Sequence, residues 1–143
     1  LQNIGSLVIY LTVPELAKEA ITSALFGSET LYEAERRLLG FDHTEVGEAL
    51  AKKWRLPAAL TETIRHHHTP SEAELFPVET AVIHISDIMV TSAGIFGHAG
   101  DRYVARFDPK AWEKLKLDEQ QLPDIMQQVT DKTRDLTLVL SSA

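Results

Sequence analysis

The length and composition of the segment from Val78 to Ala93 predict a helix. Apolar residues lie on nearly every side of this helix. Its apolar members include Val78, Ala81, Val82, Ile83, Ile85, Ile88, Met89 and Val90. A helix that is apolar all round is buried within a protein rather than laid on its surface. The segment also carries His84 and Asp87 on one side of the helix, and a buried carboxylate needs a histidinium, an arginine or a metal as its partner.

Helical spacing of apolar residues also runs through the rest of the chain, whereas the alternation typical of strands is short wherever it occurs. Further helices are predicted over residues 2–11, from 14, over 28–39, over 43–54, from 57 to a run of histidines, after 108, and from 118 to the end. Ser28 and Asp42 are the expected caps of two of them, and Gly40 is an expected stop. We therefore predict one all-α domain over residues 1–143, an irregular multi-helix bundle.

The composition of the 143-residue chain is that of an ordinary globular domain, with 44% apolar residues and no cysteine. The net charge is −7, and Lys52-Lys53-Arg55 is interpreted as a solvated helix face, so nucleic-acid binding is not expected. No apolar run reaches the roughly 20 residues of a membrane span, and we expect a cytoplasmic protein. Trp54 and Trp112 are expected in the core. The start at Leu1, inside an apolar segment, is interpreted as a fragment of a longer protein.

A run of three histidines, His66-His67-His68, ends the helix predicted from residue 57. Helical spacing places His67 and His68 on the same inward stripe as Leu60 and Ile64. His66 points about 100° away and is expected at the edge of the helix. The inward pair needs polar partners from elsewhere in the fold.

Three predicted helices bring polar residues inward: His43 on the first, His67 and His68 on the second, and His84 and Asp87 on the third. Neutral imidazoles together with a carboxylate suit Zn, Fe, Mn and similar ions. The same side chains could instead hydrogen-bond one another in a polar core. Spacing alone leaves both a metal site and a polar core cluster open.

Six short motifs, in order and spacing, resemble the HDOD domain, the HD-related output domain of bacterial signalling proteins. They are Gly40-Phe41-Asp42-His43, Val46-Gly47, Leu50-Ala51, Trp54-Arg55-Leu56-Pro57, Ile64-Arg65-His66-His67-His68 and His84-Ile85-Ser86-Asp87. More distantly, they resemble the HD-GYP cyclic-dinucleotide phosphodiesterases and other HD metallohydrolases. The resemblance implies an HD-domain-like fold, of which the chain would form the C-terminal half to two-thirds, without the N-terminal helical lobe.

In the HD superfamily, a helix with a histidine–aspartate pair supplies ligands to a metal centre, and the matching stretch here is Leu1-Gln2-Asn3-Ile4-Gly5. Gln2 stands where the metal-binding histidine would be, and Asn3 where the metal-bridging aspartate would be. Asparagine lacks the charge that a divalent centre needs, and glutamine is a poor substitute for imidazole. Loss of the bridging carboxylate should also disable activation of the attacking water.

The later ligand positions are retained, because His43, His67, His68 and Asp87 match ligands of the HD-GYP type. They are possible ligands of one divalent metal, although no cofactor is required, and His84 is expected to join the same remnant network.

The resemblance implies a non-catalytic signalling output or scaffold domain, whose partners are other signalling proteins or fused regulatory domains. One alternative is a metal-dependent phosphohydrolase that cuts a nucleotide or a cyclic dinucleotide. Another is a domain that senses a metal or nucleotide without turnover. The oligomeric state is left open.

Overall fold

The computed structural model describes residues 1–93 and 106–141, and these residues form α-helices and short 3-10 helices without a strand. The α-helices are α1 (Ile4–Thr12), α2 (Pro14–Phe26), α3 (Leu31–Leu39), α4 (His43–Lys53), α5 (Ala58–His66), α6 (Pro77–Ser92), α7 (Pro109–Leu115) and α8 (Leu122–Ser141). The 3-10 helices are η1 (Pro70–Glu72) and η2 (Glu119–Gln121). The predicted all-α fold is confirmed. A search of the described helices finds none with the length and apolar character of a membrane span.

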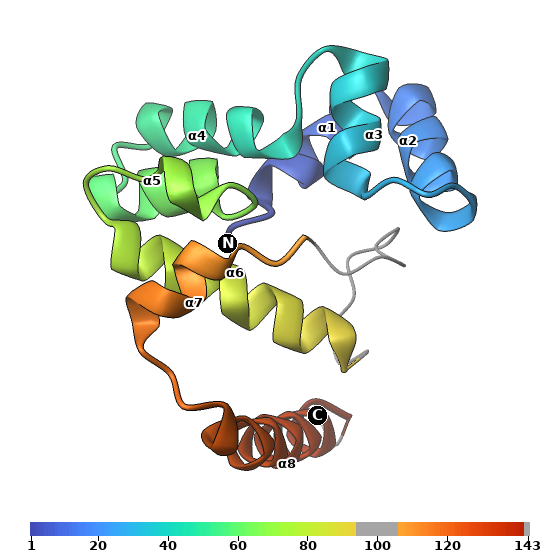
Figure 1. Cartoon of the computed structure of the whole chain (residues 1–143). Helices are drawn as coiled ribbons and strands as arrows, with labels where there is room; N and C mark the ends of the chain where they lie inside the picture. The colour runs from blue at the N-terminus through green and yellow to red at the C-terminus, as the bar shows by residue number, and fades with distance from the viewer. Residues whose placement is uncertain (94–105, 142–143) are drawn as a thin grey trace.

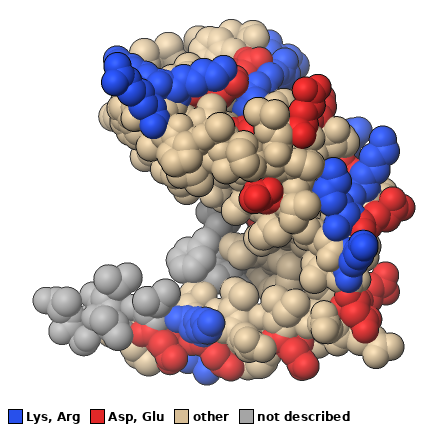
Figure 2. All heavy atoms as spheres, turned by 90° about the vertical axis from the view of Figure 1, so that its left-hand side faces the viewer, with Lys and Arg blue, Asp and Glu red and all other residues tan. Residues whose placement is uncertain are grey.

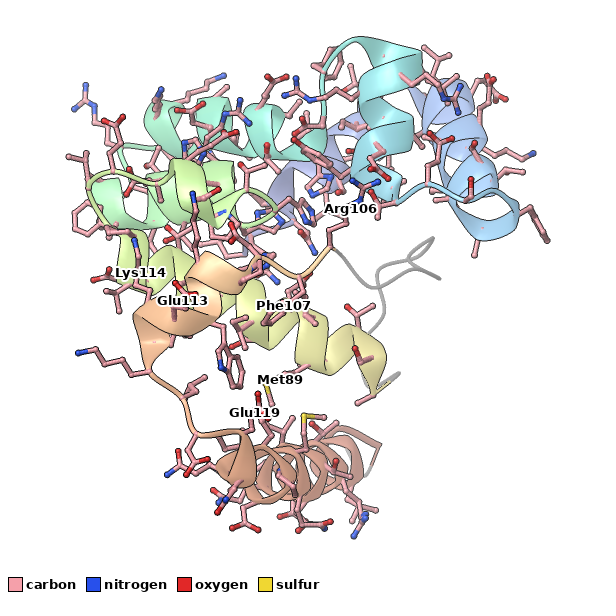
Figure 3. The ribbon with its side chains drawn as sticks, in the orientation of Figure 1. Met89, Arg106, Phe107, Glu113, Lys114 and Glu119 are labelled. Carbon is pink, nitrogen blue, oxygen red and sulfur yellow. The ribbon has the colours of Figure 1, made fainter. Side chains whose placement is uncertain are left out.

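Several helices that follow one another along the chain pack together, and α1 also packs against α4 (Figure 1). α2 packs on α3, α4 on α5, α5 on α6, and α6 on α7. Small apolar residues allow close packing at two of these interfaces. The α2–α3 interface buries Ala20, Ala24, Leu31 and Ala34, and the α6–α7 interface buries Ala81, Ile85 and Ala111. α8 lies beyond α6 and α7, and Met89 extends toward it from α6 (Figure 3).

Capping side chains set the ends of the helices around the histidines. Thr30 accepts the backbone N–H of Glu33, while Glu33 accepts the backbone N–H of Thr30, so a capping box begins α3. The prediction of Ser28 as this cap is wrong, because Glu33 closes the box with the residue three positions before it. Gly40, at a left-handed φ of 80°, ends α3, and Asp42 caps α4 as predicted.

Two glycines allow α1 and α4 to approach each other closely. A Cβ atom added to Gly5 would lie 2.0 Å from the carbonyl oxygen of His43 and 2.7 Å from the backbone nitrogen of Gly47. A Cβ atom added to Gly47 would lie 2.6 Å from Cγ2 of Ile64, on α5. The missing side chains therefore bring the backbones of α1 and α4 together and make room for the Ile64 side chain of α5.

α6 is covered on one side, contrary to the expectation of burial all round. His84 and Ile85 are buried, whereas Val78 is 50% and Val82 44% exposed. Among the described elements, α5, α7 and η1 make the main contacts with α6, and they leave these valines uncovered. The expectation of a core position is also wrong for Trp54, which is 55% exposed, because α4 ends just before it.

Candidate functional site

Asp42 positions the first histidine of the site. Its Oδ1 accepts hydrogen bonds from the backbone and the hydroxyl of Thr44 (2.8 and 2.5 Å), and its Oδ2 accepts one from Nε of Arg36 (2.9 Å). Burial would raise the pKa of this carboxyl, but the Thr44 hydrogen bonds and the Arg36 charge outweigh burial and hold the pKa below its usual value. Asp42 thereby fixes the N-terminus of α4, whose first residue is His43.

Glu35, on α3, holds the ring of His43. Its Oε2 accepts the backbone N–H of His43 at 2.9 Å and lies 2.6 Å from Nδ1 of the same residue. Both side chains are almost completely buried. When Glu35 is a carboxylate, it accepts the Nδ1–H, so Nε2 of His43 faces the other histidines. Sequence reasoning missed Glu35, although it continues the buried stripe of Leu31 and Ala34.

His67 presents an unpaired ring nitrogen to the site. Its Nδ1 lies 2.9 Å from the carbonyl oxygen of Ile64 and therefore carries the proton that bonds there. Its Nε2 is buried and has no hydrogen-bond partner among the residues that the structure describes. Burial, followed by the nearby charge of His43, lowers the pKa of His67 to about 3. His67 is therefore neutral near pH 7, with a lone pair on Nε2.

Three imidazoles meet where α4 and α5 face each other. Nε2 of His43 lies 3.1 Å from Nε2 of His68, and one ring nitrogen from each of His43, His67 and His68 lies within 4.8 Å of the other two. The ring centroids of His67 and His68 are 4.1 Å apart, and Tyr32 packs on His68 at 5.0 Å. We call His43, His67 and His68 the histidine cluster.

The geometry of the histidine cluster fits a divalent cation. Zn–N bonds of about 2.0–2.1 Å in a tetrahedral site put ligand nitrogens roughly 3.3 Å apart, close to the His43–His68 separation of 3.1 Å. Glu35 and the carbonyl of Ile64 hold the outer ring nitrogens of His43 and His67, as partners of metal-binding histidines commonly do. The cluster could therefore hold a cation with three neutral nitrogen ligands.

Acid should destabilise the protein through His67. The pKa of His67 is lowered to about 3 in the folded protein, against about 6.5 in an unfolded chain, so the unfolded state binds more protons between these values. Stability from the neutral ring is full above about pH 6.5 and is lost as the pH falls toward 3. We expect His67→Gln to flatten this part of a melting-temperature profile against pH. An equally steep profile in the variant would contradict the assignment.

His84 is satisfied by backbone groups on both sides of its ring. Its Nδ1 donates to the carbonyl oxygen of His67 at 2.8 Å, and its Nε2 accepts the backbone N–H of Asp108 at 3.2 Å. Both ring nitrogens are therefore engaged, and neither is available as a ligand. His84 joins α6 to the end of α5 and to the start of α7, which makes it a structural link beside the histidine cluster.

The structure places Asp87 outside the histidine cluster. Its Oδ1 accepts a hydrogen bond of 3.5 Å from Nε2 of Gln2, whose Oε1 accepts one from the N-terminal amine of Leu1. Asn3, at the start of α1, is partly buried and makes no cap hydrogen bond through its side chain. The polar residues predicted to converge are thus divided into the histidine cluster and a Gln2–Asp87 pair. The proposed role of Asp87 as a ligand stays a prediction.

The neighbours of the inward pair lie on another face of α5. His66 is partly exposed, and its Nδ1 lies 3.5 Å from Oε2 of Glu72. Arg65 donates to the hydroxyl of Thr44 at 2.8 Å and pairs with Glu45 and Glu48 at 3.3 and 3.5 Å. These contacts bind α5 to α4 and keep the two helices in the arrangement that the histidine cluster needs.

Comparison with known proteins supports the HD-domain-like fold. A family model described as HDOD domain matches residues 1–70, so His43, His67 and His68 lie inside the match, and His84 and Asp87 outside it. No curated protein matches the chain. A crystal structure from Marinobacter aquaeolei VT8, of a protein provisionally described as a signal transduction protein, is similar with a TM-score of 0.77 and 17% sequence identity. The likeness covers 97% of this chain but 30% of that protein's chain.

Proposed function

Residues 1–70 belong to the HDOD domain family, and from this membership we propose that the chain is a non-catalytic signalling module that acts by binding other proteins. Its partners would be signalling proteins or regulatory domains fused to it, in the bacterial cytoplasm. The similar fold of a protein provisionally described as acting in signal transduction supports this role.

The hydrogen bond between Gln2 and Asp87 carries the proposal. In the HD resemblance, these positions belong to a metal-binding histidine and a late carboxylate ligand. Here Nε2 of Gln2 faces Oδ1 of Asp87 at 3.5 Å, and an amide nitrogen donates a proton rather than a lone pair. The amide thus occupies a carboxylate oxygen that a cation would otherwise use, while Asn3 offers no charge to bridge two metals.

The histidine cluster would then have a structural role: its polar contacts would fix the relative positions of the helices in the module. Through Glu35, His43 and the two inward histidines it connects α3, α4 and the end of α5. Buried hydrogen bonds such as the one between Glu35 and His43 can specify one arrangement of helices. A module of this kind presents a defined surface to its partners.

An assay of cyclic-dinucleotide hydrolysis with Mn²⁺ or Fe²⁺ tests the proposal. We expect no turnover from the purified chain above that of the metal alone. His66→Ala is the matched control for His67→Ala, because His66 belongs to the same run but lies outside the cluster. Turnover that survives in His66→Ala and disappears in His67→Ala would overturn the non-catalytic role.

The unpaired Nε2 of His67 favours a second candidate, a module that senses a divalent metal without turnover. We expect Zn²⁺ to raise the melting temperature of the wild type and of His66→Gln, but not that of His67→Gln. Binding to the folded state alone gives about 2.7 kcal/mol at a free metal concentration of 100 times Kd. Isothermal titration calorimetry measures the same binding directly. Equal increases in melting temperature in all three proteins would show that Zn²⁺ binds outside the histidine cluster, and they would contradict the metal-sensing role.

A further inference from the structure

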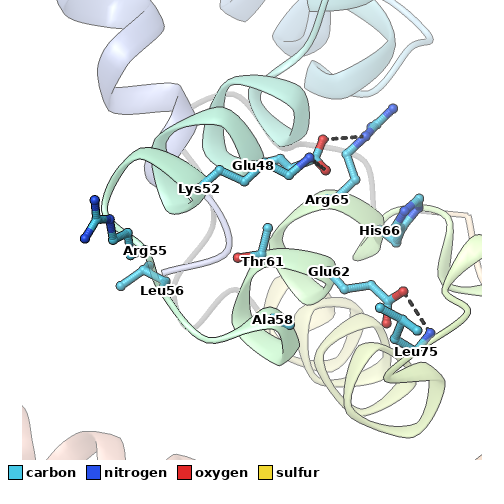
Figure 4. A pocket seen from close by; sticks show the side chains of 10 residues that line it. All are labelled: Glu48, Lys52, Arg55, Leu56, Ala58, Thr61, Glu62, Arg65, His66 and Leu75. Carbon is cyan, nitrogen blue, oxygen red and sulfur yellow. Dashed lines mark hydrogen bonds and ion pairs between the residues drawn. The ribbon is translucent and has the colours of Figure 1, made fainter.

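A groove of about 510 Å³ lies between the end of α4 and the exposed side of α5 (Figure 4). Glu48, Lys52 and Arg65 lie along one wall, and Arg55 and Leu56 lie at one end. His66 lines the groove, whereas His67 and His68 face the histidine cluster. The groove is therefore a different surface from the histidine cluster.

Arg55 holds an unfavourable backbone conformation at the end of this groove. Its φ is 55°, in the left-handed region where glycine is the usual residue after a helix. The backbone N–H of Leu56 reaches the carbonyl of Ala51 at 3.0 Å, which completes the turn that normally selects glycine. An arginine at this position makes the protein less stable than glycine would, and it places a guanidinium at the mouth of the groove. Strain of this kind in a structure is commonly associated with function.

The acidic residues of the groove already have partners within the fold. Glu62 accepts the backbone N–H groups of Glu74, Leu75 and Phe76, and Glu48 lies 2.6 Å from Lys52 and 3.5 Å from Arg65. Among the residues that the structure describes, no carboxylate oxygen lies within 4.0 Å of Arg55 or Lys53. Arg55 and Lys53 are therefore basic groups without an acidic partner among the described residues, in a chain whose net charge is −7.

Apolar surface borders the same groove. Leu75 lines it and is 72% exposed, and Leu56 and Ala58 contribute further apolar surface. Trp54, next to Arg55 in the chain, is 55% exposed. Figure 2, which views the molecule from the side where α4 ends, shows Lys and Arg side chains gathered over its upper part. Tryptophan and arginine are among the residues most enriched at the energetic centres of protein interfaces.

We propose that this groove docks an acidic segment of a partner protein, with an apolar side chain in the groove and carboxylates against Arg55 and Lys53. The inference rests on the proposed protein-binding role and names the surface that performs it. Charge complementarity selects the acidic partner. Glu48 and Glu62 on the walls would repel the closely spaced phosphates of a nucleic acid, whereas the carboxylates of a peptide can be spaced to meet Arg55 and Lys53 and leave its apolar side chains to the groove.

Fluorescence anisotropy with a labelled peptide of about 12 residues, made of Asp, Glu and Ser around two central leucines, tests the proposal. Two probes accompany it: a peptide with Lys in place of Asp and Glu, and a single-stranded DNA of similar length. We expect the acidic peptide to bind and the others to bind about tenfold more weakly or not at all. Equal binding of the DNA would overturn the choice of a protein partner, and no binding of the acidic peptide would overturn the docking surface.

Arg55→Gly separates docking from folding. We expect it to raise the melting temperature by roughly 2–6 °C, because it relieves the left-handed strain, and to weaken acidic-peptide binding about tenfold. Arg55→Lys should keep most of the binding. Lys18→Glu, an exposed charge reversal on α2, should leave binding nearly unchanged and is the control for net charge. Unchanged affinity in Arg55→Gly would overturn the proposal.

The test is independent of the hydrolysis assay. Turnover of a cyclic dinucleotide would overturn the non-catalytic role. The docking surface would still be tested by comparing acidic-peptide binding in the wild type and in Arg55→Gly. Absence of both turnover and peptide binding would leave the non-catalytic role in place and overturn this surface.

Discussion

Gly5→Ala is expected to lower the free energy of unfolding by about 3 kcal/mol. The new Cβ atom would clash with backbone atoms, which cannot rotate away as a flexible side chain can. The nearest atom, the carbonyl oxygen of His43, would lie 2.0 Å away, and the backbone nitrogen of Gly47 would lie 2.7 Å away. Relief requires α1 to move away from α4. Helix propensity acts in the opposite direction, since alanine stabilises a helix interior by roughly 1 kcal/mol relative to glycine. The sign of the change therefore shows which effect dominates.

Urea unfolding followed by far-UV circular dichroism measures the change. Leu11→Ala is the control on the same helix, because Leu11 is 85% exposed and should change stability little. Gly47→Ala should cost less than Gly5→Ala, because its closest contact is a side-chain methyl of Ile64 at 2.6 Å rather than backbone. A Gly5→Ala protein as stable as the wild type would show that α1 does not cross α4 at this point.

Asp42→Ala is expected to cost about 3 kcal/mol. Loss of a helix N-cap costs about 1 kcal/mol, and the buried donors that lose their acceptor add about 1–3 kcal/mol. Asp42 is completely buried, and Thr44 and Arg36 both donate to it. Asp42→Asn keeps an oxygen for the cap but loses the charge that faces Arg36, so it should fall between Ala and the wild type.

The pH dependence of the same variants is a second measurement. The pKa of Asp42 is lowered in the folded state, so its stabilising contribution is fully present above the ordinary carboxyl pKa of about 4. It is lost as the pH falls below 4, through the lowered folded pKa. Asp42→Asn should therefore show a flatter loss of stability below about pH 4. An unchanged acid profile would mean that Asp42 is not ionised against Arg36 in the folded protein.

Sequence patterns were most informative where the relevant contacts are local. The stop at Gly40, the cap at Asp42 and the division of His66 from the inward His67 and His68 depend on residues a few positions apart. The sequence predicts Ser28 as a cap where the structure has Thr30, because both residue types suit the position and only the box with Glu33 separates them.

The residues that make up the site were harder to predict from the sequence, because they come from helices that are far apart in the chain. Glu35 holds His43 from α3, and it could have been found as a glutamate on the stripe of Leu31 and Ala34. His84 has backbone partners on both ring nitrogens, which no spacing rule indicates. Asp87 pairs with Gln2 from the other end of the chain rather than with a histidine ring.

Periodicity and caps were thus sufficient for an all-α fold and for the shared direction of His67 and His68. These properties follow from backbone geometry and side-chain chemistry within a few turns of one helix. The replacement of a metal-binding pair by Gln2 and Asn3 stays a prediction from the family resemblance. Which face of α6 is covered, and which atom each histidine contacts, depended on how α1, α4, α5 and α6 cross. Crossing is set by the combined packing of distant surfaces, such as Gly5 on Gly47, and therefore only the folded chain reveals it.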